Sequence, residues 1–189
     1  MDDDNQFLVS SFLLSSVQSK PIDYLWKGRI ALGMLTMWDG DPATGKTSAA
    51  MDIAARITTG SPMPGEDEGR DPRGVILMTA EDSLEQTIRP RMEAAGADLN
   101  RVGIVVKRKP EGAGYINPVI PEDIEGIAGQ VDALDAALIL IDPAMAYISG
   151  QLDSNNDQNV RAALAPLVAM ADDKQCAVLM IRHLNKQSG

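Results

Sequence analysis

The stretch Gly40-Asp41-Pro42-Ala43-Thr44-Gly45-Lys46-Thr47 matches the pattern G-x-x-x-x-G-K-[ST] in full. The glycines of this pattern let the backbone wrap around a phosphate group, so that successive N–H groups point into the loop. Lys46 is placed to reach the β- and γ-phosphates of a nucleotide, and the Thr47 hydroxyl to bind Mg²⁺. The first helical turn, which includes Ser48, adds the positive end of a helix dipole. The stretch therefore predicts a nucleotide-binding loop.

Five short apolar runs, rich in β-branched residues or methionine, punctuate the chain. They cover residues 34–38, 75–79, 102–106, 137–141 and 177–181. Each run is almost continuously hydrophobic, which is typical of strands buried on both faces of a parallel sheet. Helical patterns lie between the runs, and this alternation predicts an α/β fold with a doubly wound, mainly parallel sheet.

The helical patterns cover residues 47–59, 83–96, 121–131 and 160–171. Gly60 is placed to end the first of them. Ser83 and Gln86 form a capping-box pattern that opens the second. Pro90 and Pro166 predict kinks in the second and the last helix, because proline lacks the N–H that continues the hydrogen-bond ladder.

The composition limits the class of protein. The 189 residues, 44% hydrophobic and 23% charged, predict one soluble domain with a real core. The net charge of −10 argues against broad coating of a nucleic acid or an anionic membrane, although a local basic groove stays open. A single cysteine, Cys176, and a single histidine, His183, rule out a disulfide framework and a Cys/His zinc cluster, and predict a reducing, cytoplasmic setting. The apolar stretch 7–17 is short, broken by serines and preceded by aspartates, so we expect neither a signal nor a membrane anchor.

An acidic residue at the end of a buried strand is needed to hold Mg²⁺ through water. The run Leu138-Ile139-Leu140-Ile141-Asp142 has this form, with four aliphatic residues followed by a carboxylate. The alternative is an ordinary strand-ending aspartate at the turn into Pro143. Together with the nucleotide-binding loop, the pattern favours Asp142 as an Mg²⁺ residue.

Hydrolysis also requires a group that orients or deprotonates the attacking water. Glu81 follows directly on the run 75–79, and the carboxyl ends of parallel strands all face the nucleotide crevice. A carboxylate there can take the proton of the water. Asp82 is the competing candidate, and it can instead cap or pair with the next helix. The position at the strand end favours Glu81.

His183 follows the last predicted strand and is therefore expected on the same rim as Lys46, Glu81 and Asp142. A lone histidine is more often a structural hydrogen-bonding residue. At this rim it can instead donate to the γ-phosphate and distinguish ATP from ADP. The tail Asn185-Lys186-Gln187-Ser188 lacks the aspartate of the guanine-reading pattern N-K-x-D, so the sequence favours ATP over GTP.

Together, these motifs resemble those of RecA-like ATPases of the RepA type, which include plasmid and phage hexameric replicative helicases. The resemblance rests on residues 40–47, Glu81-Asp82 with Pro90-Arg91 after it, Asp142-Pro143, His183-Leu184-Asn185-Lys186 and the lead-in Trp26-Lys27-Gly28-Arg29-Ile30. It implies a RecA-like P-loop NTPase core that binds ATP and Mg²⁺ through Lys46, Thr47 and Asp142. It also implies catalysis by Glu81, γ-phosphate sensing by His183, and assembly into a homo-hexameric ring.

The resemblance also bears on where the core begins and ends. It implies an N-terminal segment over residues 1–20 and an ATPase core over residues 21–189. Members of the family continue past the histidine with more sheet and an arginine finger, whereas this chain ends six residues after His183. We therefore expect a core that is truncated at its C-terminus.

Contact with single-stranded DNA has two candidate sites. Lys107-Arg108-Lys109 is the one dense basic cluster, for which a solvated strand end is the alternative. Residues 144–156 are the other, since loops after the Mg²⁺-binding strand line the channel of ring-shaped relatives. Tyr147 in that loop can stack on a base or pack against the sheet.

The rival functions for the whole chain are a RecA- or KaiC-like regulatory or repair switch and a nucleotide-binding module without turnover. A small-molecule kinase is disfavoured, because no arginine-rich lid is present.

Overall fold

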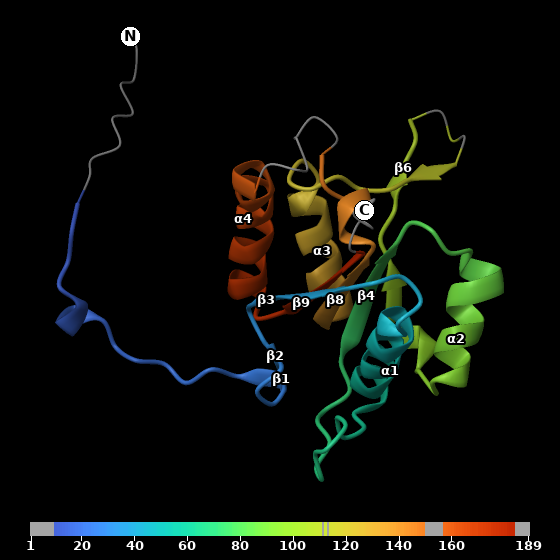
Figure 1. Ribbon diagram of the computed structural model, residues 1–189, viewed down its shortest axis with the longest axis horizontal. Coiled ribbons are helices and arrows are strands. Elements are labelled where there is room, and N and C mark those ends of the chain that lie inside the picture. Colours follow the sequence, from blue (N-terminus) through green and yellow to red (C-terminus); the bar gives the residue numbers. More distant parts are fainter. Residues whose placement is uncertain (1–9, 111, 113, 150–156, 184–189) are drawn as a thin grey trace, which may run out of the picture.

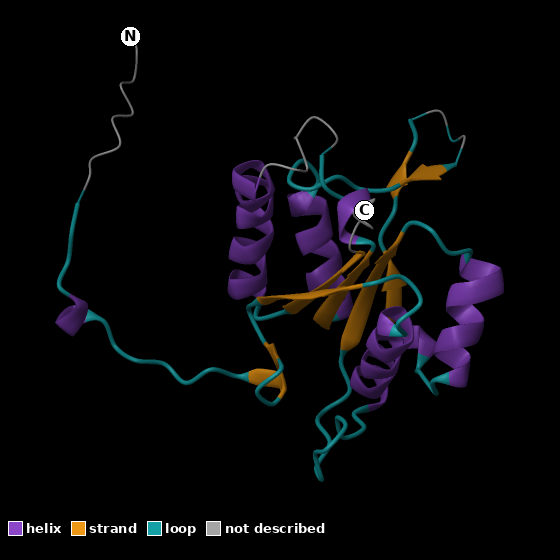
Figure 2. Ribbon diagram, viewed as in Figure 1, coloured by secondary structure: helices purple, strands orange, loops and turns teal. Residues whose placement is uncertain are grey.

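A computed structural model describes residues 10–110, 112, 114–149 and 157–183 of the chain. At its centre is a five-stranded sheet in which every pairing is parallel, shown in Figures 1 and 2. The strands are β3 (Leu35–Gly40), β4 (Gly74–Thr79), β5 (Val102–Ile104), β8 (Ala136–Asp142) and β9 (Ala177–His183). Their order across the sheet is β3-β9-β8-β4-β5. The five predicted strands and the parallel α/β fold class are therefore confirmed.

Helices cover both faces of this sheet (Figure 1). The helices α1 (Lys46–Thr59) and α2 (Arg89–Ala94) lie on one face, and α3 (Ile124–Leu134) and α4 (Asp157–Lys174) lie on the other. This arrangement leaves the central strands buried on both sides, which is why their sequences are almost continuously apolar.

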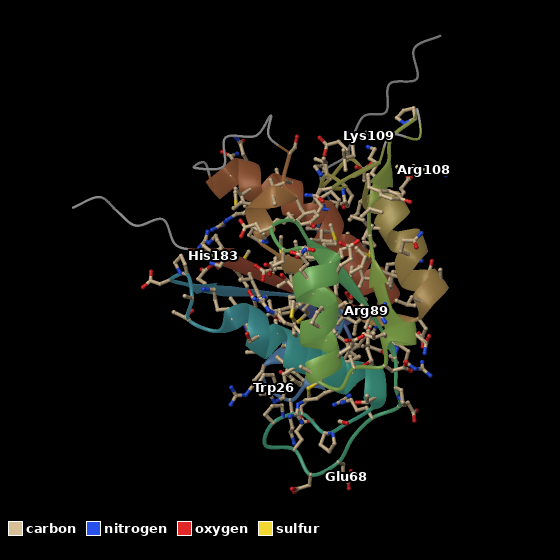
Figure 3. All side chains as sticks on the ribbon, turned by 90° about the vertical axis from the view of Figure 1, so that its right-hand side faces the viewer. Trp26, Glu68, Arg89, Arg108, Lys109 and His183 are labelled. Atoms are coloured by element: carbon tan, nitrogen blue, oxygen red, sulfur yellow. The ribbon has the colours of Figure 1, made fainter. Side chains whose placement is uncertain are left out.

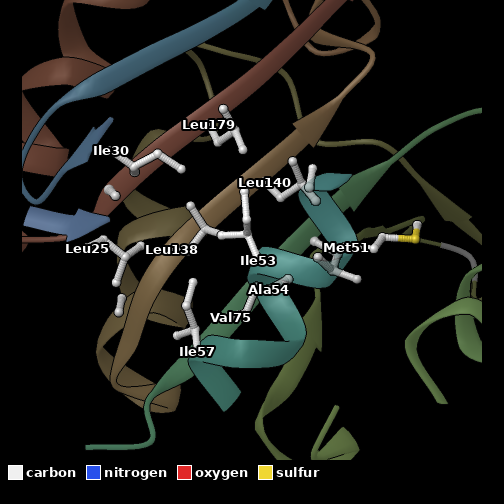
Figure 4. Close-up of a cluster of buried hydrophobic side chains, with 14 of the residues drawn as sticks. Leu25, Ile30, Met51, Ile53, Ala54, Ile57, Val75, Leu138, Leu140 and Leu179 are labelled. Atoms are coloured by element: carbon white, nitrogen blue, oxygen red, sulfur yellow. The ribbon is translucent and has the colours of Figure 1, made fainter. Parts of the chain in front are cut away.

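Each face of the sheet has its own hydrophobic core. Successive residues of β8 point in opposite directions, so Leu138 and Leu140 pack with α1, whereas Ile139 and Ile141 pack with α3 and α4. Figure 4 shows the first of these clusters, with Ile53 of α1 facing Leu138 and Leu140. Fully burying one such side chain stabilises the fold by about 1.5–3 kcal/mol.

The helix boundaries follow from local sequence. Gly60 ends α1 with a left-handed φ of 74°, a conformation that glycine adopts without strain. The N–H of Gln86 donates to Ser83 Oγ at 3.2 Å, as the capping pattern predicts. The segment after Ser83 begins as a π-helical turn, Leu84–Ile88, and becomes α2 at Arg89, so the predicted helix is split next to Pro90. In contrast, α4 continues through Pro166.

Two small antiparallel sheets flank the core. One pairs β1 (Tyr24–Trp26) with β2 (Ile30–Ala31), and the other pairs β6 (Lys107–Arg108) with β7 (Tyr115–Ile116). Short 3₁₀ turns lie at Leu14–Ser16, Leu99–Arg101 and Ala144–Ala146. Ahead of β1, residues 10–20 run away from the core (Figure 1). Within the described residues, no helix combines the length and the apolar character needed to cross a bilayer.

Candidate nucleotide site

Four strands of the sheet bring their carboxyl ends to one edge. The register pairs Gly40 at the end of β3 with His183 at the end of β9, and Thr79 at the end of β4 with Asp142 at the end of β8. Because β9 lies between β3 and β8, His183 at the end of β9 lies between the loop that follows β3 and Asp142 at the end of β8. Residues that are far apart in the sequence thus meet at the edge where open α/β sheets bind ligands.

The loop between β3 and α1 has the backbone form that a bound phosphate requires. Gly45, directly before the first residue of α1, has a φ of 85°, which glycine tolerates because it has no Cβ. A Cβ on Gly40 would lie 3.6 Å from Lys46 Nζ, an ordinary contact distance, so the backbone of Gly40 lies directly beside the ammonium. The loop leads into a helix of 14 residues, whose N-terminal N–H groups and dipole favour an anion.

The ammonium of Lys46 is held against the loop itself. Its Nζ donates to the carbonyl oxygen of Gly40 at 2.8 Å, to that of Asp41 at 2.7 Å and to Thr44 Oγ1 at 3.2 Å. Thr44 Oγ1 in turn donates to the Asp41 carbonyl at 2.9 Å. The positive charge therefore sits within the curve of the loop, where it complements phosphate oxygens.

Thr47 and Asp142 lie in direct contact. Thr47 Oγ1 donates to Asp142 Oδ2 at 2.5 Å, which joins the first turn of α1 to the end of β8. A hydroxyl and a carboxylate are the hard oxygen donors that Mg²⁺ takes in nucleotide sites, usually together with water and phosphate oxygens. The residues present therefore fit ATP with Mg²⁺, with the loop for the phosphates and this pair for the cation.

The two candidate carboxylates, Glu81 and Asp82, differ in their contacts. Asp82 accepts a hydrogen bond from Arg91 Nη1 at 3.0 Å, as one partner of an ion pair with α2. Glu81 is exposed and makes no ion pair with a described residue. It follows Ala80, whose N–H donates to the Asp142 carbonyl at 3.3 Å, so its backbone lies at the edge that carries the loop. This arrangement leaves Glu81 available for chemistry and gives Asp82 a structural contact.

His183 lies at the same edge, half-buried, and Figure 3 shows it at the end of its strand. Its Nδ1 is buried and has no hydrogen-bond partner among the described residues. A buried imidazole nitrogen without a partner is costly, and it marks a group with hydrogen-bonding capacity to spare. The position fits the predicted γ-phosphate sensor. The following residues, Asn185 and Lys186 among them, lie outside the described part of the chain.

One pair at this edge was not found by reading the sequence. Arg182 Nε and Nη2 donate to the two carboxylate oxygens of Asp39, both at 2.8 Å. These residues are register partners and directly precede Gly40 and His183, so the bidentate contact fixes β9 against β3 just below the loop. The only sequence signal for this pair is that each charged residue directly precedes a motif residue. That signal does not indicate which residues of the two strands are paired.

The two candidate DNA contacts are not equally supported. Tyr147 is only 1% exposed and packs in the core under α3 and α4, so it is not available to stack on a base. Burial, and to a smaller extent the charge of Asp142, raises the pKa of its hydroxyl. Residues 150–156 of that loop lie outside the described residues. Lys107 of the basic cluster is used in an ion pair with Asp123, whereas Arg108 and Lys109 are exposed.

Comparison of the sequence with those of known proteins identifies its family. The sequence matches the AAA domain family (AAA_25) over residues 5–189, almost the whole chain. It is also 22% identical over 167 residues to the DNA repair protein RadA of Mycobacterium tuberculosis, strains CDC 1551 / Oshkosh and H37Rv. That alignment covers 87% of this chain and 30% of each relative, so the chain spans less than a third of the length of these curated relatives. With its nucleotide loop, parallel sheet and strand-end carboxylates, the chain belongs to the AAA domain family and has a RecA-like P-loop ATPase core.

Proposed function

We propose that this chain binds ATP and Mg²⁺, hydrolyses the ATP, and uses the reaction in work on single-stranded DNA. The observation that carries the ATPase part is the contact between Thr47 Oγ1 and Asp142 Oδ2, at the residue directly after Lys46, whose ammonium lies against the loop. It supports a cation site next to a phosphate-binding lysine. The DNA part is supported by the similarity to a protein named for DNA repair.

The roles of the residues follow from their chemistry. Bound ATP supplies the phosphoryl group, and Mg²⁺ supplies charge that offsets the charge developing on the phosphate oxygens. The loop N–H groups and Lys46 hold the phosphates, and Thr47 with Asp142 holds the cation. Glu81 accepts a proton from the attacking water. His183, through the ring nitrogen that has no partner among the described residues, reports the presence of the γ-phosphate.

Two versions of the DNA activity differ in what the ATPase drives. The motif resemblance favours a replicative helicase motor that works as a homo-hexameric ring. The similarity to RadA favours a repair ATPase that uses ATP as a switch. We place either version in the cytoplasm, because a single buried cysteine suits a reducing compartment.

The test measures phosphate release from ATP by the chain with and without single-stranded DNA. We expect Mg²⁺-dependent turnover, raised by DNA, and its loss in Lys46→Ala. Lys27→Ala, which removes an exposed cation outside the loop, is the matched control. Turnover that survives Lys46→Ala would contradict the site assignment. Displacement of a strand from a tailed duplex supports the helicase version, and DNA-stimulated turnover without displacement supports the switch.

A further inference from the structure

The β6–β7 hairpin presents an arginine and a tyrosine side by side. Arg108 and Tyr115 are opposite each other in the antiparallel register, so both side chains lie on the same face of the hairpin. Tyr115 is 67% exposed, and Arg108 is exposed as well. Lys109, the next residue along, donates its N–H to the Gly114 carbonyl at 3.1 Å and extends the pairing. The hairpin therefore places Arg108 beside the ring of Tyr115 on one face, whereas Lys109, the next residue along the strand, projects from the other face.

The base of the hairpin is anchored to the domain by a separate contact. Lys107 Nζ donates to both carboxylate oxygens of Asp123, at 2.7 and 3.0 Å, and the Val119 N–H donates to Asp123 Oδ2 at 2.9 Å. These hydrogen bonds, that of Lys107 first, hold the pKa of Asp123 below its ordinary value, so the carboxylate stays charged. Lys107 thus anchors the hairpin, and Arg108 and Lys109 are the cations of the cluster that can contact a partner.

Arg108 and Lys109 of the hairpin are not used in ion pairs with described carboxylates. Within the described residues, ion pairs with carboxylates engage eight arginine or lysine side chains, and neither Arg108 nor Lys109 is among them. Figure 3 shows both at the upper end of the molecule, far from Glu68 and Trp26. The stretch 107–116 holds three basic residues and one acidic residue, against a net charge of −10 for the whole chain. This surface therefore attracts an anionic partner that most of the protein repels.

The hairpin also lies at the nucleotide end of the sheet. It begins three residues after the carboxyl end of β5, and β5 pairs with β4, the strand that leads to Glu81. In Figure 1 it lies at the opposite end of the sheet from residues 60–73. A partner held by the hairpin is thus connected through two neighbouring strands to the candidate catalytic carboxylate.

We propose that the β6–β7 hairpin binds single-stranded DNA through Arg108 and Tyr115 on one face, with Lys109 adding a cation on the other face. The two cations contact backbone phosphates, and the exposed ring of Tyr115 stacks on an unpaired base. A single strand fits better than a duplex, because the bases of a duplex are already stacked and cannot take up the ring. The proposal rests on the proposed function, whose DNA partner it assigns to a surface of the chain.

The experiment measures the binding of a fluorescent oligodeoxythymidine of about 20 nucleotides by anisotropy, at about 50 mM and about 200 mM salt. The double variant Arg108→Ala/Lys109→Ala should bind about tenfold or more weakly at the lower salt, with a salt slope smaller by about 1.4. Tyr115→Ala should weaken binding by about tenfold, and Tyr115→Phe should restore it, because the stacking ring is kept. The matched control is Lys27→Ala/Arg70→Ala, which removes two exposed cations from the surface that carries Glu68.

Each outcome bears on one part of the proposal. Equal loss in the control and hairpin variants, or equal binding by the hairpin variants and the unchanged chain, overturns the hairpin site and leaves the DNA function standing. Absence of binding by the unchanged chain overturns both, while Lys46-dependent ATP turnover in the same preparation still tests the ATPase separately. Stronger binding of an oligouridine of equal length keeps the hairpin as the site but replaces DNA by RNA as its ligand.

Discussion

Thr47 and Asp142, 95 residues apart in the sequence, are joined by a hydrogen bond of 2.5 Å from the threonine hydroxyl to the carboxylate. The contact ties the start of α1 to the end of β8. Two oxygen donors suited to Mg²⁺ are therefore adjacent in the fold of the chain alone.

The first prediction tests this pair. Asp142→Asn keeps the size of the side chain but removes the charge that attracts the cation. We expect ATP turnover to fall by about 10- to 100-fold and the Mg²⁺ concentration for half-maximal rate to rise. Thr47→Val should act in the same direction, whereas Thr47→Ser, which keeps the hydroxyl, should stay close to the unchanged chain. A normal Mg²⁺ titration for Asp142→Asn would exclude Asp142 from the cation site.

The second prediction separates the two neighbouring carboxylates. Glu81→Gln should bind ATP normally and lose turnover, because the amide cannot accept the proton of the attacking water. Asp82→Asn breaks an exposed ion pair with Arg91, which is worth about 0–1 kcal/mol, and should leave turnover within about twofold. Nucleotide affinity and phosphate release are measured on the same preparations. The reverse pattern would identify Asp82 as the catalytic residue.

The third prediction concerns His183. His183→Ala removes the ring nitrogen that has no partner among the described residues. We expect ADP affinity to stay within about twofold and ATP turnover to fall by about tenfold or more, since the group acts on the γ-phosphate, which ADP lacks. The ratio of ADP to ATP affinity is the second measurement. A variant that binds both nucleotides and turns over ATP as the unchanged chain does would make His183 a structural residue.

The fourth prediction concerns the thiol of Cys176. Burial raises its pKa to about 12, from an ordinary value of 9.0. The folded chain should therefore resist a thiol-specific disulfide reagent at pH values near about 8, and should react once denaturant unfolds it. The two pKa values also set a pH window for stability.

Below pH 9 the thiol carries its proton in the folded and in the unfolded state, so its contribution to stability is fully present. As the pH rises from about 9 towards about 12, only the unfolded state loses the proton, and the free energy of unfolding falls by about 1.4 kcal/mol per pH unit from this group. Cys176→Ala should remove that part of the alkaline loss, measured by denaturant unfolding at the two ends of the window. The same slope in both proteins would contradict the assignment to this thiol.

Much of the fold could be predicted from the sequence, because the strands are short and buried on both faces. The runs that include Val75 and Leu138 are apolar throughout, and this signal is local. The order of the strands could not be predicted in the same way. It depends on which faces pack against which helices, and no local pattern shows that β9 lies between β3 and β8. The β1–β2 and β6–β7 pairs were missed, since strands of two or three residues carry little periodicity.

The candidate site, like the fold, could be predicted only in part. Lys46, Thr47, Asp142, Glu81 and His183 were placed at one edge by a rule of topology, that parallel strands end together. Side-chain partnerships need the register and rotamers, which the sequence does not carry. The pairing of Asp39 with Arg182 therefore appears only in three dimensions, whereas the expected alternative role of Asp82, pairing with the next helix, is confirmed by its contact with Arg91.

The position of β3 in the sheet affects the order in which the domain is made. β3 ends at Gly40, yet its only sheet neighbour in the described part of the chain is β9, which starts at Ala177. At about 5–20 residues per second, a ribosome needs roughly 7–30 s to translate the stretch between them. During that time β3 has no neighbouring strand to pair with. The strand that leads into the phosphate-binding loop is thus among the first parts of the sheet to be synthesised and the last to be paired.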